Sequence, residues 1–146
     1  MVRLSLSNIR LWVLHGPQAK SGCAISTSLF AIILMDIDYF KLVNDQFGHR
    51  AGDADLKMIA DVIKTDVRAS DFVGPWGGEE FIILSPQTDV ASAISLAEKM
   101  LNRLASADFD KIGHRAACFG VASFDQGDEI ESLVCRADAG LYAAKT

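Results

Sequence analysis

The chain has 146 residues, of which 50% are hydrophobic and 23% are charged, and its net charge is −5. This length and composition predict one globular domain and exclude a disordered chain. The negative charge argues against broad binding to a nucleic-acid polymer, but it allows a nucleotide ligand, because a bound divalent cation offsets acidic side chains.

The cysteines and the apolar runs indicate the cellular compartment in which the protein is expected. Cys23, Cys118 and Cys135 are odd in number and lack CxxC spacing, which favours a reduced cytoplasmic setting without structural zinc. The longest strongly apolar run, Leu29 to Met35, is far shorter than the ~20 residues that a membrane helix needs. The first residues also lack the continuous apolar stretch of a signal peptide. We therefore expect a cytoplasmic protein with no membrane contact in this chain.

The first readable element is a strand. Residues 1–28 give only a short possible helix that Gly16 and Pro17 would end. The apolar run from Leu29 to Met35 then predicts a strand buried on both faces. Asp36 and Asp38 follow it two residues apart, so both carboxylates project to one side. They are either solvated turn residues or part of a metal or polar site.

Two helices are expected next. Apolar spacing predicts a helix over residues 39–47, and residues 48–52 then break the chain. Asp53 is expected at the N-cap or in the first turn of a second helix, and taken alone it needs no other role. Asn44 alone is likewise an ordinary polar helix residue. The apolar stripe of the second helix consists of Leu56, Ile59, Ala60, Ile63 and Val67.

A β-hairpin is predicted over residues 72–84, with Gly77 and Gly78 at its turn. Glu79 and Glu80 follow directly. Adjacent carboxylates at a bare turn repel each other and bury nothing. The turn is either a solvated acidic loop or a place where a cation binds and a phosphate approaches the backbone.

The remaining chain predicts a helix, a strand and a helix. Thr88 or Asp89 caps the first helix, residues 106–114 form a polar loop, residues 115–122 form a central strand, and Asp128 begins the last helix. The first helix has the apolar stripe Val90, Ile94, Ala97, Leu101 and Leu104, and the last has Ile130, Leu133, Val134, Ala137 and Leu141.

The order of elements predicts an α/β (α+β) fold with a central mixed, largely antiparallel sheet flanked by helices. In such a sheet the end of the first strand can lie beside the hairpin turn. The four carboxylates at these two points, those of Asp36, Asp38, Glu79 and Glu80, would then converge. Hard oxygen ligands suit Mg²⁺ or Mn²⁺ rather than zinc, and they fit phosphoryl or nucleotidyl transfer.

Three motifs in order resemble the GGDEF domains, or diguanylate cyclases. MDIDYFKLVNDQFGHRAGD is similar to DxDxFKxxNDxxGHxxGD, WGGEEF to the GGDEF or GGEEF signature, and CRADAGLYAAK to ADxALYxAK. The similarity runs from about Leu29 to Lys145, and the correct spacing of three motifs makes it specific.

The resemblance implies a fold like the nucleotidyl cyclase and polymerase palm. It also implies condensation of two GTP molecules into cyclic di-GMP and two pyrophosphates by a homodimer that holds one GTP in each subunit. Asp36, the Ile37 carbonyl and Glu79 would ligate Mg²⁺ (or Mn²⁺), and Glu80 would serve a second metal or the reacting hydroxyl. For GTP, the resemblance implies that Asn44 and Asp53 recognise guanine and that the backbone at Gly77 and Gly78 lies close to a phosphate. Lys41 and Lys145 would bind the outer phosphates. The pocket would be lined by Tyr39, Phe40 and His49.

A second implied site is inhibitory. Arg68 and Asp71 have the RxxD spacing, five residues before the glycine pair, at which the family binds its product. Arg can stack on a purine and donate two hydrogen bonds, and Asp can accept from the guanine edge. The alternative is an ordinary surface ion pair.

Four departures from the family pattern stand out. The usual N-terminal motif survives only faintly in residues 6–10, Pro75 and Trp76 replace an Arg and an aromatic residue, and Cys118 stands where Ser is frequent. The chain also ends at Thr146, before the family's GRNxV segment. We therefore expect residues 1–28 to be a divergent N-terminal segment of the same domain, and residues 29–146 to be a GGDEF domain without its last strand.

The leading hypothesis is a Mg²⁺-dependent diguanylate cyclase with product inhibition. The alternative is a degenerate, non-catalytic module that binds GTP or cyclic di-GMP for signalling. A third possibility, a palm-like nucleotidyltransferase with another product, is disfavoured because Asn44 and Asp53 point to guanine.

Overall fold

A four-stranded sheet forms the centre of the fold. The computed structural model describes residues 29–38, 40–107, 116–124 and 128–145. Its strands are β1 (Phe30–Ile37), β2 (Phe72–Pro75), β3 (Glu80–Pro86) and β4 (Ala117–Ser123), in the spatial order β2-β3-β1-β4. Every pairing in this sheet is antiparallel. The expected α+β class with a largely antiparallel sheet is confirmed.

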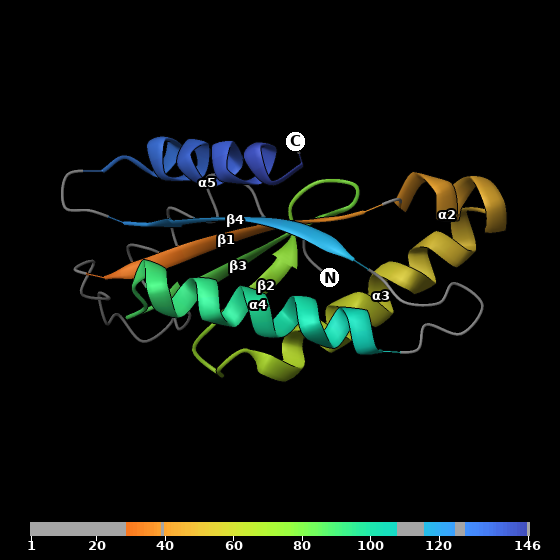
Figure 1. The fold of residues 1–146 in the computed structure, drawn as a ribbon, viewed down its shortest axis with the longest axis horizontal. Coiled ribbons are helices and arrows are strands. Elements are labelled where there is room, and N and C mark those ends of the chain that lie inside the picture. The colour runs from red at the N-terminus through yellow and green to blue at the C-terminus, as the bar shows by residue number, and fades with distance from the viewer. Residues whose placement is uncertain (1–28, 39, 108–115, 125–127, 146) are drawn as a thin grey trace, which may run out of the picture.

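Helices cover both faces of the sheet. They are α2 (Phe40–Phe47), α3 (His49–Asp66), α4 (Val90–Ser106) and α5 (Ile130–Lys145). Figure 1 shows α5 on one face and α3 with α4 on the other. None of the helices in the described ranges is long and apolar enough to cross a membrane.

Strand β1 supplies side chains to both layers of the core. Its odd-numbered residues from Ala31 to Ile37 pack with α3 and α4, and its even-numbered residues from Phe30 to Leu34 pack with α5. This division follows from the alternation of side chains along a strand. All eight residues of β1 are buried, which confirms the predicted strand buried on both faces.

The predicted hairpin is formed by β2 and β3. Pro75 lies opposite Phe81, and the Trp76 N–H donates to the Glu80 carbonyl at 2.8 Å. Because hydrogen-bonded and non-bonded pairs alternate in an antiparallel ladder, the nitrogen of Pro75 faces away from β3. Strand β2 is also at the edge of the sheet, where proline is tolerated. The expected loss of a hairpin donor therefore costs no hydrogen bond to β3.

Three details of the predicted elements are wrong. Helix α3 begins at His49, directly after Gly48, so Asp53 lies inside the helix and does not cap it. Among the described strands, β4 lies at an edge of the sheet rather than at its centre. In α4, Val90 and Ile94 are exposed, and the core-facing side chains are those of Ala93, Ala97, Met100 and Leu104.

Other predicted elements are confirmed or fall outside the residues that the structure describes. The stripes of α3 and α5 pack into the core as expected, and Asp89, not Thr88, caps α4 by accepting a hydrogen bond from Ser92 N at 2.7 Å. The predictions for residues 1–28, for Tyr39 and for most of the 106–114 loop fall outside the described residues.

Candidate functional site

A row of polar side chains crosses one end of the sheet. Asp36 lies opposite Glu80 on β3 and opposite Cys118 on β4. The even-numbered side chains of β1 point toward α5. The side chains of Asp36 and of its partners Glu80 and Cys118 therefore lie on the α5 side of the sheet. The Asp36 side chain is only 5% exposed, because neighbouring strands flank it on both sides. The structure thus brings two of the predicted carboxylates into register on adjacent strands.

The backbone at this end ties β1 to the hairpin turn. Ile37 N donates to the Glu79 carbonyl at 3.1 Å. The N–H and C=O of a strand residue point to the same side, so the Ile37 carbonyl also faces Glu79. Glu79 is half-buried at the end of the turn. An oxygen ligand from Ile37 and one from Glu79 are therefore compatible with a single site.

Asp38 contacts Cys118, the residue that lies opposite Asp36 on β4. The Cys118 thiol lies 3.4 Å from Asp38 Oδ1 and 3.8 Å from Oδ2, so Asp38 is turned toward β4. Across the described part of the chain, no three His, Cys, Asp or Glu side chains form a group that could hold a metal ion. The structure shows the register pair Asp36 and Glu80, and the convergence of all four carboxylates stays a prediction.

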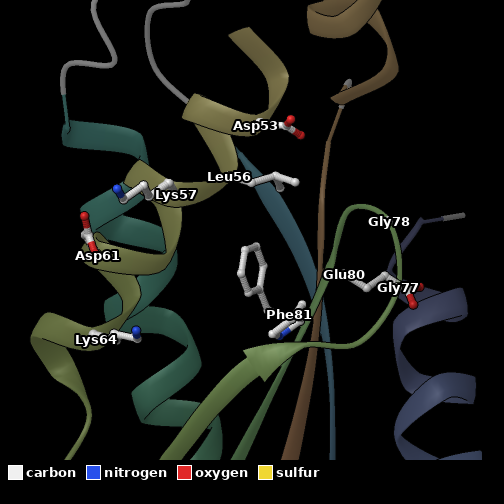
Figure 2. A pocket seen from close by; sticks show the side chains of 10 residues that line it. Asp53, Leu56, Lys57, Asp61, Lys64, Gly77, Gly78, Glu80 and Phe81 are labelled. Atoms are coloured by element: carbon white, nitrogen blue, oxygen red, sulfur yellow. The ribbon is translucent and has the colours of Figure 1, made fainter. Parts of the chain in front are cut away.

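A cavity of about 700 Å³ lies between α3 and the hairpin. Its lining residues come from both elements: Asp53, Leu56, Lys57, Asp61, Lys64, Pro75, Gly77, Gly78, Glu80 and Phe81. Figure 2 shows Asp53 and Leu56 projecting from α3, the two glycines on the facing turn, and Phe81 turned toward α3. Three apolar side chains and a bare glycine turn give this cavity room for a flat ring and a closely approaching anion.

Gly77 and Glu80 are in contact across the turn. A Cβ on Gly77 would lie 3.0 Å from Glu80 Oε2, which is closer than ordinary packing allows. Gly78 has no atom within 4 Å of the corresponding position. The first glycine therefore makes room for the Glu80 carboxylate, and the second leaves the turn open.

Gly52 allows Asn44 of α2 to pack against α3, one residue before Asp53. A Cβ on Gly52 would overlap the Asn44 side-chain oxygen, so the missing side chain allows α2 and α3 to approach closely. Asn44 is half-buried at this contact, and Asp53 follows one residue later and lines the cavity.

The other residues implied by the resemblance are distributed around these features. Phe40, the first residue of α2, is buried in the core. Lys41 and His49 are exposed near the starts of α2 and α3. Tyr39 and the side chain of Lys145 lie outside the described structure. Phe40, Lys41 and His49 are not among the described residues that line the cavity.

Arg68 and Asp71 form a closed turn on the far side of the hairpin. Arg68 N donates to Asp71 Oδ2 at 2.8 Å, Arg68 Nη2 donates to Asp71 Oδ1 at 3.2 Å, and Asp71 N donates to the Arg68 carbonyl at 3.0 Å. The Asp71 side chain is 1% exposed, whereas that of Arg68 is 54% exposed. The pair lines a second cavity of about 390 Å³.

Sequence reasoning missed several residues at both cavities. Lys57, Asp61 and Lys64 line the first, and Gln87, Thr88 and Lys99 line the second. The three residues on α3 carried a weak signal, since their spacing of four and three lies on one helix face. For Thr88, the sequence indicated only a possible role as the cap of the following helix.

The chain is similar to known proteins in sequence and in structure. A family model described as "Diguanylate cyclase, GGDEF domain" matches residues 6–146. A diguanylate cyclase of Vibrio cholerae is 43% identical over 115 residues, which is 77% of this chain and 36% of that protein. The chain spans between 17% and 36% of the length of such curated relatives.

Two solved structures are similar as well. One is the active GGEEF domain of a diguanylate cyclase from Vibrio cholerae, with a TM-score of 0.76, 41% identity, and coverage of 81% of this chain and 77% of that one. The other is the GGDEF domain of DgcB from Caulobacter crescentus in complex with c-di-GMP, with a TM-score of 0.75, 29% identity, and coverage of 81% and 70% respectively.

Proposed function

The chain belongs to the GGDEF domain family, and on this basis we propose that it acts as a diguanylate cyclase that condenses two GTP molecules into cyclic di-GMP and two pyrophosphates. The observation that carries the proposal is the register pair of Asp36 and Glu80 beside the Gly77–Gly78 turn. It joins hard oxygen ligands to a backbone that a phosphate can approach. The 700 Å³ cavity next to it contains Asp53, which suits guanine recognition.

A divalent cation, Mg²⁺ or Mn²⁺, would be held at the end of β1. The donor set fits such an ion, because Asp36 is a buried carboxylate and the Ile37 carbonyl and Glu79 face each other. Mg²⁺ is usually bound by one or two carboxylates together with substrate phosphates and water, so a protein cluster of three carboxylates is not required. When bound, the ion offsets negative charge on the phosphates in the transition state.

Guanine would be recognised by Asp53 together with Asn44. A carboxylate can accept both adjacent N–H groups of the guanine edge, which adenine does not offer. The side-chain amide of Asn44, which packs on the residue before Asp53, would add a donor and an acceptor. The close packing of Asn44 on Gly52 supports this role, because it restricts where the amide can lie.

The phosphates would lie against Gly77 and Gly78, with Lys41 and Lys145 as positive charges at the outer phosphates and Tyr39, Phe40 and His49 near the nucleotide. Glu80 would serve a second metal or the attacking 3′-hydroxyl. Two chains would face each other as a homodimer, since each 3′-hydroxyl must reach the α-phosphate of the other GTP.

The test is chromatography of nucleotides after incubation of concentrated protein with GTP and Mg²⁺. We expect cyclic di-GMP and pyrophosphate from the wild-type chain. Asp36→Asn and Glu80→Gln should each lower product formation by about 100-fold or more, the scale of losing one electrostatic stabiliser. Glu98→Gln, an exposed carboxylate on α4, is the matched control and should retain activity.

Two results would contradict this function. Full activity in Glu80→Gln and Asp36→Asn would remove the assigned site. Binding of GTP by calorimetry without any product, in dimeric protein, would make the chain the non-catalytic module instead.

Arg68 and Asp71 would form an inhibitory site for cyclic di-GMP. Arg68 is the more accessible partner, and its guanidinium lies at the wall of the 390 Å³ cavity. Arg68→Ala should therefore weaken the binding of cyclic di-GMP, measured by calorimetry. An unchanged affinity would contradict the site.

A further inference from the structure

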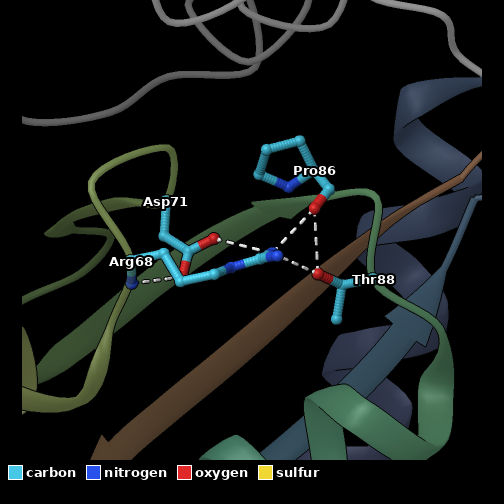
Figure 3. Close-up of polar contacts among 4 residues, drawn as sticks. All are labelled: Arg68, Asp71, Pro86 and Thr88. Carbon is cyan, nitrogen blue, oxygen red and sulfur yellow. Dashed lines mark hydrogen bonds and ion pairs between the residues drawn. The ribbon is translucent and has the colours of Figure 1, made fainter.

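The guanidinium of Arg68 is held in place by the corner between β3 and α4. Its Nη2 donates to the Pro86 carbonyl at 2.8 Å and to Thr88 Oγ1 at 2.6 Å, in addition to Asp71. Figure 3 shows the guanidinium reaching across from its own turn to this corner. Thr88 lies 20 positions further along the chain, so the contact joins two separate segments.

The two acceptors are brought together by an unusual backbone conformation. Gln87, between them, has φ of 50°, and within the described ranges no other non-glycine residue has a positive φ. Such a conformation is uncommon for a residue with a side chain and has a conformational cost, which surrounding contacts must offset. The Thr88 hydroxyl donates to the Pro86 carbonyl at 2.9 Å, so its own lone pairs are directed to accept from Arg68. Thr88 is only 6% exposed, which keeps water from competing for this contact.

The same contacts leave part of Arg68 available to a ligand. Within the described part of the chain, Nε and Nη1 make no hydrogen bond, and the flat face of the guanidinium is partly exposed. Lys99 and Ser95 on α4 line the cavity beside it. These groups suit a phosphate or a purine ring, since an arginine can donate to the first and stack on the second.

Asp71 holds Arg68 from the side of its own turn. Both of its oxygens accept hydrogen bonds from Arg68, and its side chain is 1% exposed. Each oxygen keeps a second lone pair, so these bonds leave the carboxylate able to accept from a ligand. Asp71 therefore fixes Arg68 from one side while Pro86 and Thr88 fix it from the other.

From this geometry we infer that Thr88 is a positioning residue of the Arg68 site: its hydroxyl holds the guanidinium in the orientation that binds an anionic guanine nucleotide. The inference rests on the proposed inhibitory site for cyclic di-GMP. A flexible arginine loses side-chain freedom when it binds a ligand, and an arginine that is already held loses less. Thr88 thus raises affinity without touching the ligand.

The experiment compares four forms of the full chain by calorimetry with cyclic di-GMP: wild type, Arg68→Ala, Thr88→Val and Thr88→Ser. Valine keeps the shape of threonine and lacks the hydroxyl, and serine keeps the hydroxyl. Thr88→Val should weaken binding by about two- to tenfold, the range expected for immobilising one side chain. Thr88→Ser should restore wild-type affinity, and Arg68→Ala should abolish binding.

A second measurement needs no ligand. In protein labelled with ¹⁵N-arginine, the Nη resonances of Arg68 should be separate in the wild type and in Thr88→Ser, because rotation of the guanidinium is hindered. They should average in Thr88→Val. If Thr88→Val does not fold, Thr88→Ala, which demands less space, takes its place in both measurements.

The outcomes separate the two ideas. If Arg68→Ala binds cyclic di-GMP as the wild type does, the inhibitory site is wrong and the role of Thr88 falls with it. If Arg68→Ala loses binding while Thr88→Val keeps wild-type affinity, the site stands and the positioning role is overturned. Failure of serine to restore affinity would also overturn it, because the hydroxyl would not be the cause.

Discussion

The side-chain oxygen of Asn44 occupies the space that a Cβ on Gly52 would fill. This relationship makes a glycine necessary inside α3, where glycine otherwise destabilises a helix by about 1 kcal/mol relative to alanine. It also sets the distance between α2 and α3 one residue before Asp53, which lines the cavity.

Gly52→Ala should therefore destabilise the domain and weaken GTP binding. Overpacking in a buried contact costs about 1–3 kcal/mol, which exceeds the gain in helix propensity. Urea unfolding and calorimetry with GTP measure the two effects. The double variant Gly52→Ala/Asn44→Ala should recover stability, because the clash is gone, but not GTP binding. Additive losses in the double variant would show that the two residues do not contact each other.

Gly120 and Gly140 form a matched pair at the contact of β4 with α5. A Cβ on Gly120 would overlap the Ala137 carbonyl oxygen and the Leu141 nitrogen, whereas a Cβ on Gly140 would lie 3.4 Å from the Gly120 Cα. Gly120→Ala should lower the free energy of unfolding by about 1–3 kcal/mol. Gly140→Ala should be neutral or raise it by up to about 1 kcal/mol, through helix propensity. Equal effects of the two substitutions in urea unfolding would contradict the packing described.

Pro75 should be nearly neutral for stability, because its nitrogen faces away from β3. Replacement of Pro75 by alanine should change the free energy of unfolding by less than about 0.5 kcal/mol, as at ordinary surface positions. Gly74→Pro is the contrasting variant, since the N–H of this neighbouring position points toward β3. It should destabilise the hairpin clearly. A large loss in Pro75→Ala, measured by chemical unfolding, would mean that the proline has a role that the ladder does not explain.

Asp89 gives α4 a pH-dependent contribution to stability. The side-chain and backbone hydrogen bonds with Ser92 lower the pKa of the Asp89 carboxyl below its ordinary value of 3.8. A lowered pKa means that the stabilisation is present above the unfolded value and is lost as pH falls through the folded one. Asp89→Ala should thus lower the melting temperature at neutral pH, and the difference from wild type should shrink in strong acid.

Asp89→Asn is the control for this cap. Asparagine caps helices about as well as aspartate but does not titrate. This variant should retain most of the melting temperature at neutral pH and lose the acid-dependent part. If it melts like Asp89→Ala at neutral pH, charge rather than the hydrogen bond stabilises the helix start.

The local patterns that the sequence carries predicted most of the fold. The buried strand β1, the hairpin and the apolar stripes of α3 and α5 each follow from periodicity and turn residues. Together they predicted that Asp36 and Glu80 would meet, because a hairpin beside β1 aligns the strand end with the turn. The start of α3 was wrong for a physical reason: Gly48 and Gly52 read as a break, but Gly52 is there for its close contact with Asn44.

The contact of Arg68 with Thr88 could not be predicted. It depends on the positive φ of Gln87, and glutamine is not a residue whose presence indicates such a turn. The edge position of β4 among the described strands could not be predicted either, because small and apolar residues are typical of a central strand. In the structure they accommodate α5, whose backbone passes directly over Gly120.

Strand β3 connects the two cavities without an intervening loop. Glu80 begins it and Pro86 ends it, about 20 Å apart for a strand of this length. It is paired with β1 over its whole length and with β2 over four residues. If β3 slid by one residue, each of its core side chains would face the wrong side of the sheet, so β3 cannot slide along β1 and β2. Sliding of β3 therefore does not couple the contacts of Arg68 to Glu80, although both lie at the ends of this strand.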